Sequence, residues 1–517
     1  MIRKFSGILL LLATAVGSVR AEIKLNSVFS DNMVLQCEMP APVWGTADPG
    51  EQITVKFAGQ QQSVVADVAG KWQVKLNPLP VSAEPRELVI TSVHSNIVIT
   101  GVLVGEVWLG SGQSNMYMHG SSYTNNDPVL AKAIAETYPK LRLLDRGSAG
   151  WELATPTNNI QFSALLFSFG FRLQQELGVP VGIMVGAVGG TPSGYWLTEE
   201  MYRSDADCRA QAQEFAKTYD FAAAQKKYQE QLADWKLAVA KAKQEKARPP
   251  WPPKPPAQAG ESAGRIGNLY EAHIQPFVPY AIRAVLWDQG ESGTGITGVD
   301  QFNVMGALIK GWRKAWGEDF PFLYMQKPSG YGIAWDWRNP TTKNASNFSP
   351  LPAQVPGNDW GLYRELHIKI QQHPKTAMVT SSDLGSGTHP TNKSGYGDRA
   401  VRVALGFVYG KKVEISGPLY ASHKIEGSKI RIKFTHVGKG LAARYSEKLQ
   451  GFMIAGADKK FHWADAVIEG DSVLVSSAAV PQPVAVRYAW SNNAPWANLF
   501  NKDGLPALTF RTDDWTR

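Results

Sequence analysis

The sequence predicts an α/β protein in three parts: a central region with a parallel sheet, flanked by N-terminal and C-terminal β-sandwich-like regions. Two observations lead to this prediction. Short apolar runs broken by Pro and Gly fill the stretches before about residue 100 and after about residue 409. Between them, strand-like and helix-like patterns alternate, as they do in parallel α/β sheets. A chain of 517 residues is also too long for a single core.

The first 21 residues have the pattern of a cleavable secretory signal peptide. Arg3 and Lys4 precede the apolar run 8–16, and Val19-Arg20-Ala21 forms a plausible cleavage site. This run is well short of the about 20 residues that a membrane-spanning helix needs, and no later stretch is long enough. We therefore expect a secreted or periplasmic protein without a membrane span.

Composition argues against nucleic-acid binding, a disulfide framework and some kinds of metal site. Loss of the signal's three basic residues lowers the formal net charge from +8 to +5, which gives no case for nucleic acid. Cys37 and Cys208 are the only cysteines and fall in different predicted domains, so a disulfide framework is not expected. A cysteine-based metal site is impossible, and the nine His residues show no HExxH-like spacing.

The N-terminal region, residues 22–100, is predicted to be a small β-sandwich. Segments 52–57 and 72–76 alternate polar and apolar residues, as half-buried antiparallel strands do. In the C-terminal region, residues 409–517, the segments 430–434, 472–475 and 484–488 are predicted strands. Both regions are expected to flank the central domain as accessory parts.

The central region, residues 101–408, is expected to contain the parallel sheet. Its strand candidates are 102–109, 181–185, 281–287, 321–325 and 377–380. Helices are predicted from Leu166 to Leu177, with Gly178 as the stop, and over 304–316 and 365–372. Residues 202–263 interrupt this pattern as an insertion, with a long charged helix that returns through a stiff Pro-rich stretch.

Polar or glycine-rich loops follow four of the predicted parallel strands. In open α/β sheets, ligands bind outside the carboxyl ends of the strands, so these loops are expected to meet at one site. They contain, in chain order, Ser114, Gly189-Gly190-Thr191, Gln289-Gly290-Glu291 and His389.

The residue types in these loops indicate acyl transfer by a serine nucleophile. His389 is the only histidine among them, so it is the natural base to activate Ser114. The amide of Ser114, an amide of Gly189 or Gly190, and the side chain of Gln289 are candidates to hold an oxyanion. Each has a structural alternative: a helix cap for Ser114, a surface turn for His389, a tight turn for the glycines, and sheet-edge hydrogen bonding for Gln289 and Glu291.

Several sequence blocks resemble those of the sialate O-acetylesterase family of SGNH-type carbohydrate esterases. They are Gly112-Gln113-Ser114-Asn115-Met116, Pro180-Val181-Gly182 running on to Gly189-Gly190-Thr191-Pro192, Trp287-Asp288-Gln289-Gly290-Glu291 with Asp288 in place of the usual Tyr, and His389-Pro390-Thr391-Asn392-Lys393. Flanking matches are Phe29-Ser30-Asp31-Asn32-Met33-Val34-Leu35-Gln36, Arg487-Tyr488-Ala489-Trp490 and Asn501-Lys502-Asp503-Gly504-Leu505-Pro506. The resemblance covers nearly the whole mature chain.

The resemblance implies an SGNH-hydrolase-like, flavodoxin-like catalytic domain with accessory β regions. It also implies removal of O-acetyl groups from sugars without a metal or organic cofactor. Ser114 occupies the nucleophile position of the first block. We assign its neighbours Gln113 and Asn115 to the oxyanion-binding or substrate-binding group.

One departure from the family pattern concerns the acid of the catalytic triad. The family usually places an Asp two or three residues before the catalytic His, where this chain has Thr388, Gly387 and Ser386. Loss of this acid can cost about 10⁴ in rate in a serine hydrolase. Three explanations compete: Asp383 or Glu291 supplies the carboxylate, a backbone carbonyl orients the ring in a Ser-His dyad, or catalysis is weakened or lost.

The sequence indicates the substrate less sharply than the chemistry. The stretch from Pro328 to Trp360 holds Tyr331, Trp335 and Trp337, which are expected either to form a wall of a sugar site or to pack internally. The prediction is a secreted serine esterase for O-acetylated sugars, with sialic acid as the family's substrate. The alternatives are an acetylesterase for xylan, pectin or another polysaccharide, and a non-catalytic carbohydrate-binding protein. Oligomeric state is not indicated.

Overall fold

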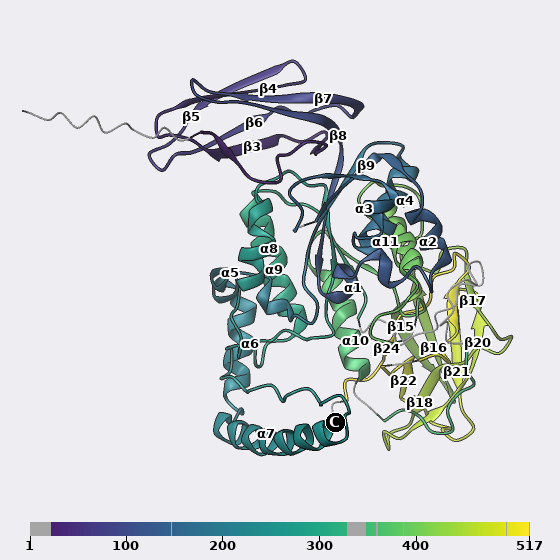
Figure 1. The fold of residues 1–517 in the computed structure, drawn as a ribbon. Helices are drawn as coiled ribbons and strands as arrows, with labels where there is room; N and C mark the ends of the chain where they lie inside the picture. The colour runs from purple at the N-terminus through teal and green to yellow at the C-terminus, as the bar shows by residue number, and fades with distance from the viewer. Residues whose placement is uncertain are drawn as a thin grey trace, which may run out of the picture.

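A computed structural model describes residues 22–145, 147–327, 348–357, 360–385, 387–492 and 494–515. The N-terminal β region, the central α/β region and the C-terminal β region follow one another through the molecule (Figure 1). The predicted signal peptide, residues 1–21, lies outside the described residues. Within those residues, no helix is both long and apolar enough to cross a membrane.

The N-terminal region consists of antiparallel β-sheets, as its alternating sequence predicts. One sheet contains β1 (Lys24–Leu25), β3 (Ala41–Thr46) and β6 (Lys71–Leu76). Facing it are β4 (Gln52–Phe57), β5 (Gln60–Val65), β7 (Ser82–Thr91) and the start of β8 (Asn96–Gly112). In β4 and β6 every second side chain is buried, which is the pattern of strands with one face on a core.

Strand β8 connects the N-terminal region to the central sheet. Its first part pairs antiparallel with β7, and a short strand, β2 (Val34–Gln36), runs parallel to it from Leu103 to Gly105. Its last part pairs in parallel with two strands of the central sheet. The domain limit predicted near residue 100 therefore falls within one continuous strand of 17 residues.

All five predicted parallel strands are present in the central sheet. In spatial order its strands are β10 (Glu152–Ala154), β9 (Tyr138–Asp145), β11 (Val181–Ala187), β8, β12 (Ala284–Asp288), β13 (Phe322–Met325) and β14 (Thr376–Val379). The five predicted strands have the spatial order 2-1-3-4-5 of flavodoxin-like sheets. Sequence reasoning missed β9, a further parallel strand, because Pro139 and charged side chains interrupt its apolar pattern.

Helices cover both faces of this sheet, and strand alternation decides which residues meet them. Trp108 and Leu286 share a core with α4 (Ala164–Leu177) and α11 (Lys393–Phe407). Val107 and Val285, one position earlier in each strand, share the other core with α9 (Gln301–Trp316) and α8 (Asn268–His273). Figure 1 shows the strands between these two groups of helices. Gly178 ends α4 in a left-handed conformation, as predicted.

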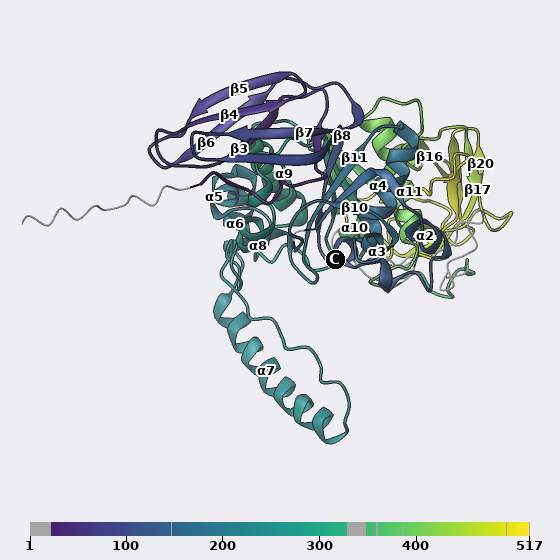
Figure 2. The ribbon, with the colours of Figure 1, turned by 45° about the horizontal axis from the view of Figure 1, so that its top comes forward.

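The predicted insertion is a helical arm. After α5 (Glu199–Ser204) and α6 (Ala206–Ala216), α7 (Phe221–Gln244) projects from the body and returns through the Pro-rich stretch (Figure 2). Trp235 Nε1 donates a hydrogen bond to the carbonyl oxygen of Pro250 at 2.8 Å, which connects α7 to the Pro-rich stretch. The remaining helices are α1 (Ser114–Tyr117), α2 (Pro128–Ile134), α3 (Pro156–Asn159) and α10 (Trp360–Lys369).

The C-terminal region has its own apolar core. One sheet contains, in spatial order, β15 (Leu419–Glu426), β16 (Lys429–Thr435), β21 (Ser472–Ser476) and β20 (Asp465–Glu469). A second contains β19 (Phe461–Trp463), β18 (Phe452–Ala455), β22 (Ala485–Tyr488) and β24 (Phe510–Arg511). A third is the pair of β17 (Leu441–Ala443) and β23 (Leu499–Asn501). Helix α10 docks against this region, since Arg364 donates hydrogen bonds to the carbonyl oxygens of Ala489 and Ser491.

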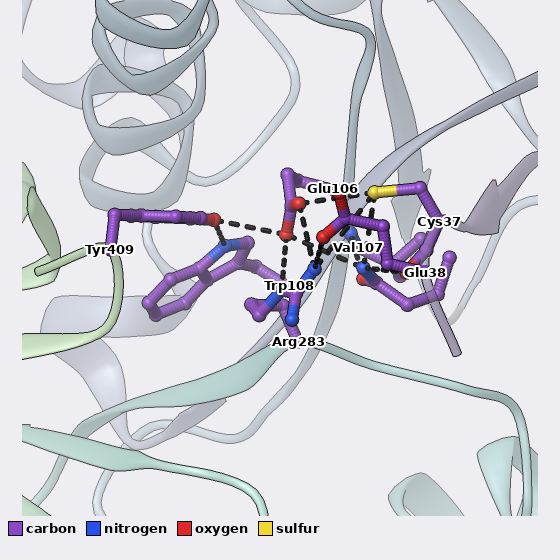
Figure 3. Close-up of polar contacts among 8 residues, drawn as sticks. Cys37, Glu38, Glu106, Val107, Trp108, Arg283 and Tyr409 are labelled. Carbon is purple, nitrogen blue, oxygen red and sulfur yellow. Dashed lines mark hydrogen bonds and ion pairs between the residues drawn. The ribbon is translucent and has the colours of Figure 1, made fainter. Parts of the chain in front are cut away.

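A buried polar cluster at the N-terminal side of the central sheet joins the N-terminal part to this sheet and to the segment that follows α11 (Figure 3). The carboxylate of Glu106, on β8, accepts hydrogen bonds from Arg283 Nε at 2.7 Å and Nη2 at 3.0 Å. The hydroxyl of Tyr409 and the thiol of Cys37 also donate to it, at 3.1 and 3.2 Å. Cys37 and Cys208 are both free thiols, so no disulfide forms between them.

Candidate active site

Ser114 lies at the C-terminal edge of the central sheet, at the turn between β8 and α1. Gly112 makes this turn possible: its φ is +128°, and a Cβ atom there would lie 2.1 Å from the carbonyl oxygen of Asp288 on β12. The amide of Gln113 donates a hydrogen bond to the same oxygen at 2.8 Å. Ser114 is thereby presented, half-buried, between strands β8 and β12, which is the switch point of this strand order.

His389 lies against Ser114, although 275 residues separate them in the sequence. It belongs to the exposed loop between β14 and α11, and its Nε2 is 2.8 Å from Ser114 Oγ. Partial burial and the nearby cation of Lys393 lower the pKa of His389. The imidazole is therefore neutral at pH 7, and its Nε2 can accept the hydroxyl proton.

The Gly189-Gly190 turn, directly after β11, also lies at Ser114. A Cβ atom on Gly189 would be 3.4 Å from Ser114 Cβ, and Gly190 has a φ of +73°. Both glycines are exposed, and the hydrogen bonds within the described part of the chain do not use their amides. These amides can therefore donate to a negative oxygen that forms above Ser114.

The prediction that Gln289 donates to an oxyanion is not supported by its contacts. Its Nε2 donates to the carbonyl oxygens of Thr191 and Gly293, both at 3.1 Å, and its Oε1 accepts from Gln301 Nε2. Both amide hydrogens are thus engaged. Gln289 instead fixes the turn that carries Gly189 and Gly190, because Thr191 follows them directly.

The contacts of Asp383 do not support its predicted role in orienting His389. Its two carboxylate oxygens accept hydrogen bonds from Nη1 and Nη2 of Arg399, at 3.1 and 3.0 Å. Arg399 lies on α11, and the bidentate pair anchors the β14–α11 loop to that helix.

Glu291 faces the site but makes no hydrogen bond to His389. Its carboxylate accepts from Asn115 Nδ2 at 3.1 Å, from Lys327 Nζ at 2.8 Å and from Gln113 Nε2. Within the described residues, Ser114 is the hydrogen-bond partner of the His389 ring, so neither a carboxylate nor a backbone carbonyl meets its Nδ1. The negative charge of Glu291 nevertheless raises the pKa of His389, in opposition to Lys393.

Gln113 and Asn115 are buried beneath the site, and this burial does not support their predicted role in binding an oxyanion or substrate. Gln113 donates to Glu291 and accepts from Ser292 Oγ at 2.9 Å. Asn115 accepts from Lys393 Nζ at 2.6 Å and donates to the carbonyl oxygen of Thr388 at 3.0 Å. Both side chains hold the site together from within.

Sequence reasoning missed two buried lysines at the site. Lys327, directly after β13, forms ion pairs with Asp288 and Glu291; burial opposes its charge, but these carboxylates raise its pKa overall. Lys393 lies among the rings of Tyr123 and Tyr396, and burial lowers its pKa to about 7. The sequence signal that could have revealed Lys327 is its place at the carboxyl end of a predicted apolar strand.

Comparisons with known proteins agree with the motif blocks. No family model matches the chain. Sialate O-acetylesterase of Mus musculus is 24% identical over 538 residues, which cover 94% of this chain and 93% of that protein. The Homo sapiens enzyme is 24% identical over 516 residues, which cover 90% of this chain and 87% of that protein. The crystal structure of a carbohydrate acetylesterase from Xanthomonas citri matches with a TM-score of 0.73 and 29% identity, covering 95% of this chain and 100% of that one.

These similarities confirm the predicted resemblance to the sialate O-acetylesterases, and with it the prediction of a carbohydrate esterase. The predicted sugar-binding wall is not tested by these similarities. Tyr331, Trp335 and Trp337 lie outside the described residues, as does the side chain of Trp360.

Proposed function

We propose that this chain hydrolyses O-acetyl esters of sugars by a serine mechanism, with Ser114 as the nucleophile and His389 as the general base. The observation that carries the proposal is the 2.8 Å contact between Ser114 Oγ and His389 Nε2 at the switch point of the sheet. A helix-capping serine would not need a histidine at this distance. The amides of Gly189 and Gly190 are the proposed oxyanion donors, together with that of Ser114.

The reaction follows from these positions. Ser114 Oγ attacks the acetyl carbonyl carbon while its proton passes to His389 Nε2, and the carbonyl oxygen becomes an oxyanion. His389 then gives this proton to the sugar oxygen, which leaves as the free hydroxyl. Water, deprotonated by the same nitrogen, attacks the acetyl-serine ester and releases acetate. Each proton taken by His389 is returned, so no other acid or base is required.

The proposed centre is a Ser-His dyad in an electrostatic field rather than a hydrogen-bonded triad. Glu291 favours the imidazolium ion by charge alone, and Lys393 disfavours it. A serine hydrolase without a bonded acid is expected to work more slowly than one with a complete triad.

The proposed substrate class is an O-acetylated sugar, with O-acetylated sialic acid as the first candidate. Two of the compared proteins bear the name sialate O-acetylesterase, and the third is described as a carbohydrate acetylesterase. Acetylated xylan and pectin are the other members of the test panel.

The test compares the wild type with Ser114→Ala on 4-nitrophenyl acetate and on a panel of acetylated sugars, with acetate release as the readout. We expect the variant to lose at least about 10³-fold in kcat, because it has no nucleophile. Equal turnover by both proteins would contradict the serine mechanism. Binding of the sugars without turnover by the wild type would favour the non-catalytic alternative.

The SGNH-hydrolase assignment and export from the cell belong to the same proposal. The 2-1-3-4-5 order of the five predicted strands, with the serine after the first of them, supports the fold assignment. The signal-like residues 1–21 support export. N-terminal sequencing of the exported protein should begin at Glu22; retention of Arg3 and Lys4 would contradict cleavage.

A further inference from the structure

The side chain of Asn115 connects the nucleophile to the loop that carries the base. Asn115 follows Ser114 in the chain and is fully buried. Its Nδ2 donates to the carbonyl oxygen of Thr388 at 3.0 Å, and Thr388 immediately precedes His389. One amide group therefore joins the residue beside the nucleophile to the residue beside the base.

We propose that Asn115 is a positioning residue that holds His389 against Ser114, a task that the carboxylate performs in a Ser-His-Asp triad. The inference rests on the proposed function. It explains how the dyad keeps its geometry although Asp383 is paired with Arg399 and no carboxylate of the described residues bonds to the ring.

The loop has little else to fix it at this point. Within the described residues, the stretch 387–389 makes two hydrogen bonds: the one from Asn115 to Thr388, and the one between His389 and Ser114. All three residues of the stretch are exposed. Without Asn115, the contact between base and nucleophile would be the one hydrogen bond left to the stretch among the residues that the structure describes.

The orientation of the Asn115 amide is determined by its other contacts. Lys393 Nζ donates to Oδ1 at 2.6 Å, and its ammonium form has no lone pair to accept, so the oxygen faces it. Glu291 Oε1, 3.1 Å from Nδ2, can only accept when ionised, so the nitrogen must face that side. The same nitrogen faces the carbonyl oxygen of Thr388. The buried lysine and carboxylate thus orient the amide so that it can hold the loop.

The test replaces Asn115 by Leu, which keeps the branched shape but removes the hydrogen bonds, and by Asp. In Asn115→Asp an oxygen replaces the donor and faces two acceptors, so it should also release the loop. Asn159→Leu is the matched control, because Asn159 is equally buried and its Nδ2 donates to the carbonyl oxygens of Ile134 and Glu136, at 3.2 and 2.9 Å. Its hydrogen bonds lie outside the site described here.

We expect both Asn115 variants to lose about 10²-fold in kcat, with KM changed less than about twofold, because a misplaced base slows chemistry more than binding. Asn159→Leu should lose stability but keep the kcat of the folded enzyme. Equal kcat values for Asn115→Leu and Asn159→Leu would overturn the proposal.

Crystal structures of the variants make the test independent of turnover. In Asn115→Leu, or in Asn115→Asp if the first does not fold, we expect residues 387–389 to move and Nε2 of His389 to leave hydrogen-bond range of Ser114 Oγ. The 2.8 Å contact should persist in Asn159→Leu. Retention of this contact in the Asn115 variant would refute the positioning role. If the loop moves in the Asn115 variants but the wild type shows no serine-dependent turnover, the esterase proposal alone would be refuted.

Discussion

At the scale of single residues, the charges around His389 set the pH range in which it can act as a base. Protonated His389 cannot accept the hydroxyl proton of Ser114, so kcat/KM should rise with pH as the imidazole loses its proton. Partial burial and the cation of Lys393 lower its pKa, so we expect the acid limb of the profile to lie below the ordinary value of 6.5. Lys393→Met removes one of these causes and should move the limb to higher pH.

The measurement is the pH profile of kcat/KM for acetate release by the wild type and by Lys393→Met. The contact of Lys393 with Asn115 is also lost, so the absolute rate should fall; the position of the limb is the diagnostic quantity. Lys24→Met, at an exposed position of β1, is the control and should keep the wild-type limb. A limb that stays in place or moves to lower pH in Lys393→Met would contradict the electrostatic account.

The two residues that carry the proposed chemistry could be found from the sequence, but most of their support could not. Ser114 and His389 each follow a predicted strand, so the rule for α/β sheets brought them to one edge. The sequence suggests Asp383 because it is the nearest acid upstream of His389; in the structure its partner is Arg399, 16 residues later on a helix whose docking angle the sequence does not reveal. Asn115, Lys327 and Lys393 share buried contacts that span up to 278 residues, and local patterns carry no such information.

At the scale of elements, Glu106 links β8 to the segments on both sides of it. Its side chain is almost fully buried and bonded to Arg283, Tyr409 and Cys37 (Figure 3). Removal of one partner from a buried ion pair leaves the other charge without compensation. We therefore expect Glu106→Ala to lower the free energy of unfolding by about 3–5 kcal/mol.

Urea denaturation of both proteins measures this change. Glu84→Ala is the control: Glu84 also pairs with an arginine, Arg86, but its side chain is 75% exposed, and exposed pairs contribute little. Equal unfolding midpoints for Glu106→Ala and the wild type would show that the cluster does not hold the elements together.

Elements with a strong local pattern were predicted closely, and those without one were missed. The alternation in residues 52–57 matches β4, and the apolar stripe that ends at Gly178 matches α4. Strand β9, which pairs with β11 and β10, was missed because Pro139 and charged side chains interrupt its apolar pattern. Helix α10 already includes Trp360, five residues before its predicted start at Glu365, and its hydrogen bonds to the C-terminal region come from distant sequence.

At the scale of the whole molecule, the N-terminal and central regions share a core, whereas most buried apolar residues of the C-terminal region form a core of their own. Val43 and Ile53 of the N-terminal strands belong to the same apolar cluster as Val285 and Leu308 of the central region. A separate cluster lies wholly within residues 430–510. The division into three parts is predicted by the change between strand-like and alternating strand-and-helix sequence patterns, but the domain limits remain predictions. Strand β8 and the shared core both cross the limit predicted near residue 100.

The helical arm is the part of the molecule that should contribute least to stability and to catalysis. Of the 24 residues of α7, Ala242 is the buried one, and the arm projects away from the body (Figure 2). Its two ends lie together, because the hydroxyl of Tyr219 donates to the carbonyl oxygen of Ala257 at 3.2 Å. Replacement of residues 222–254 by a short Gly-Ser linker should therefore shift Tm by less than about 2 °C and leave kcat unchanged.

Calorimetry and acetate release on the same preparation test this expectation. The deletion removes little apolar surface from contact with the rest of the chain, so no core is opened and little stabilisation is lost. A fall in Tm of many degrees would mean that the arm packs against the body in solution. Unchanged stability with a higher KM for acetylated polysaccharide, but not for 4-nitrophenyl acetate, would contradict functional neutrality and assign the arm to polymer binding.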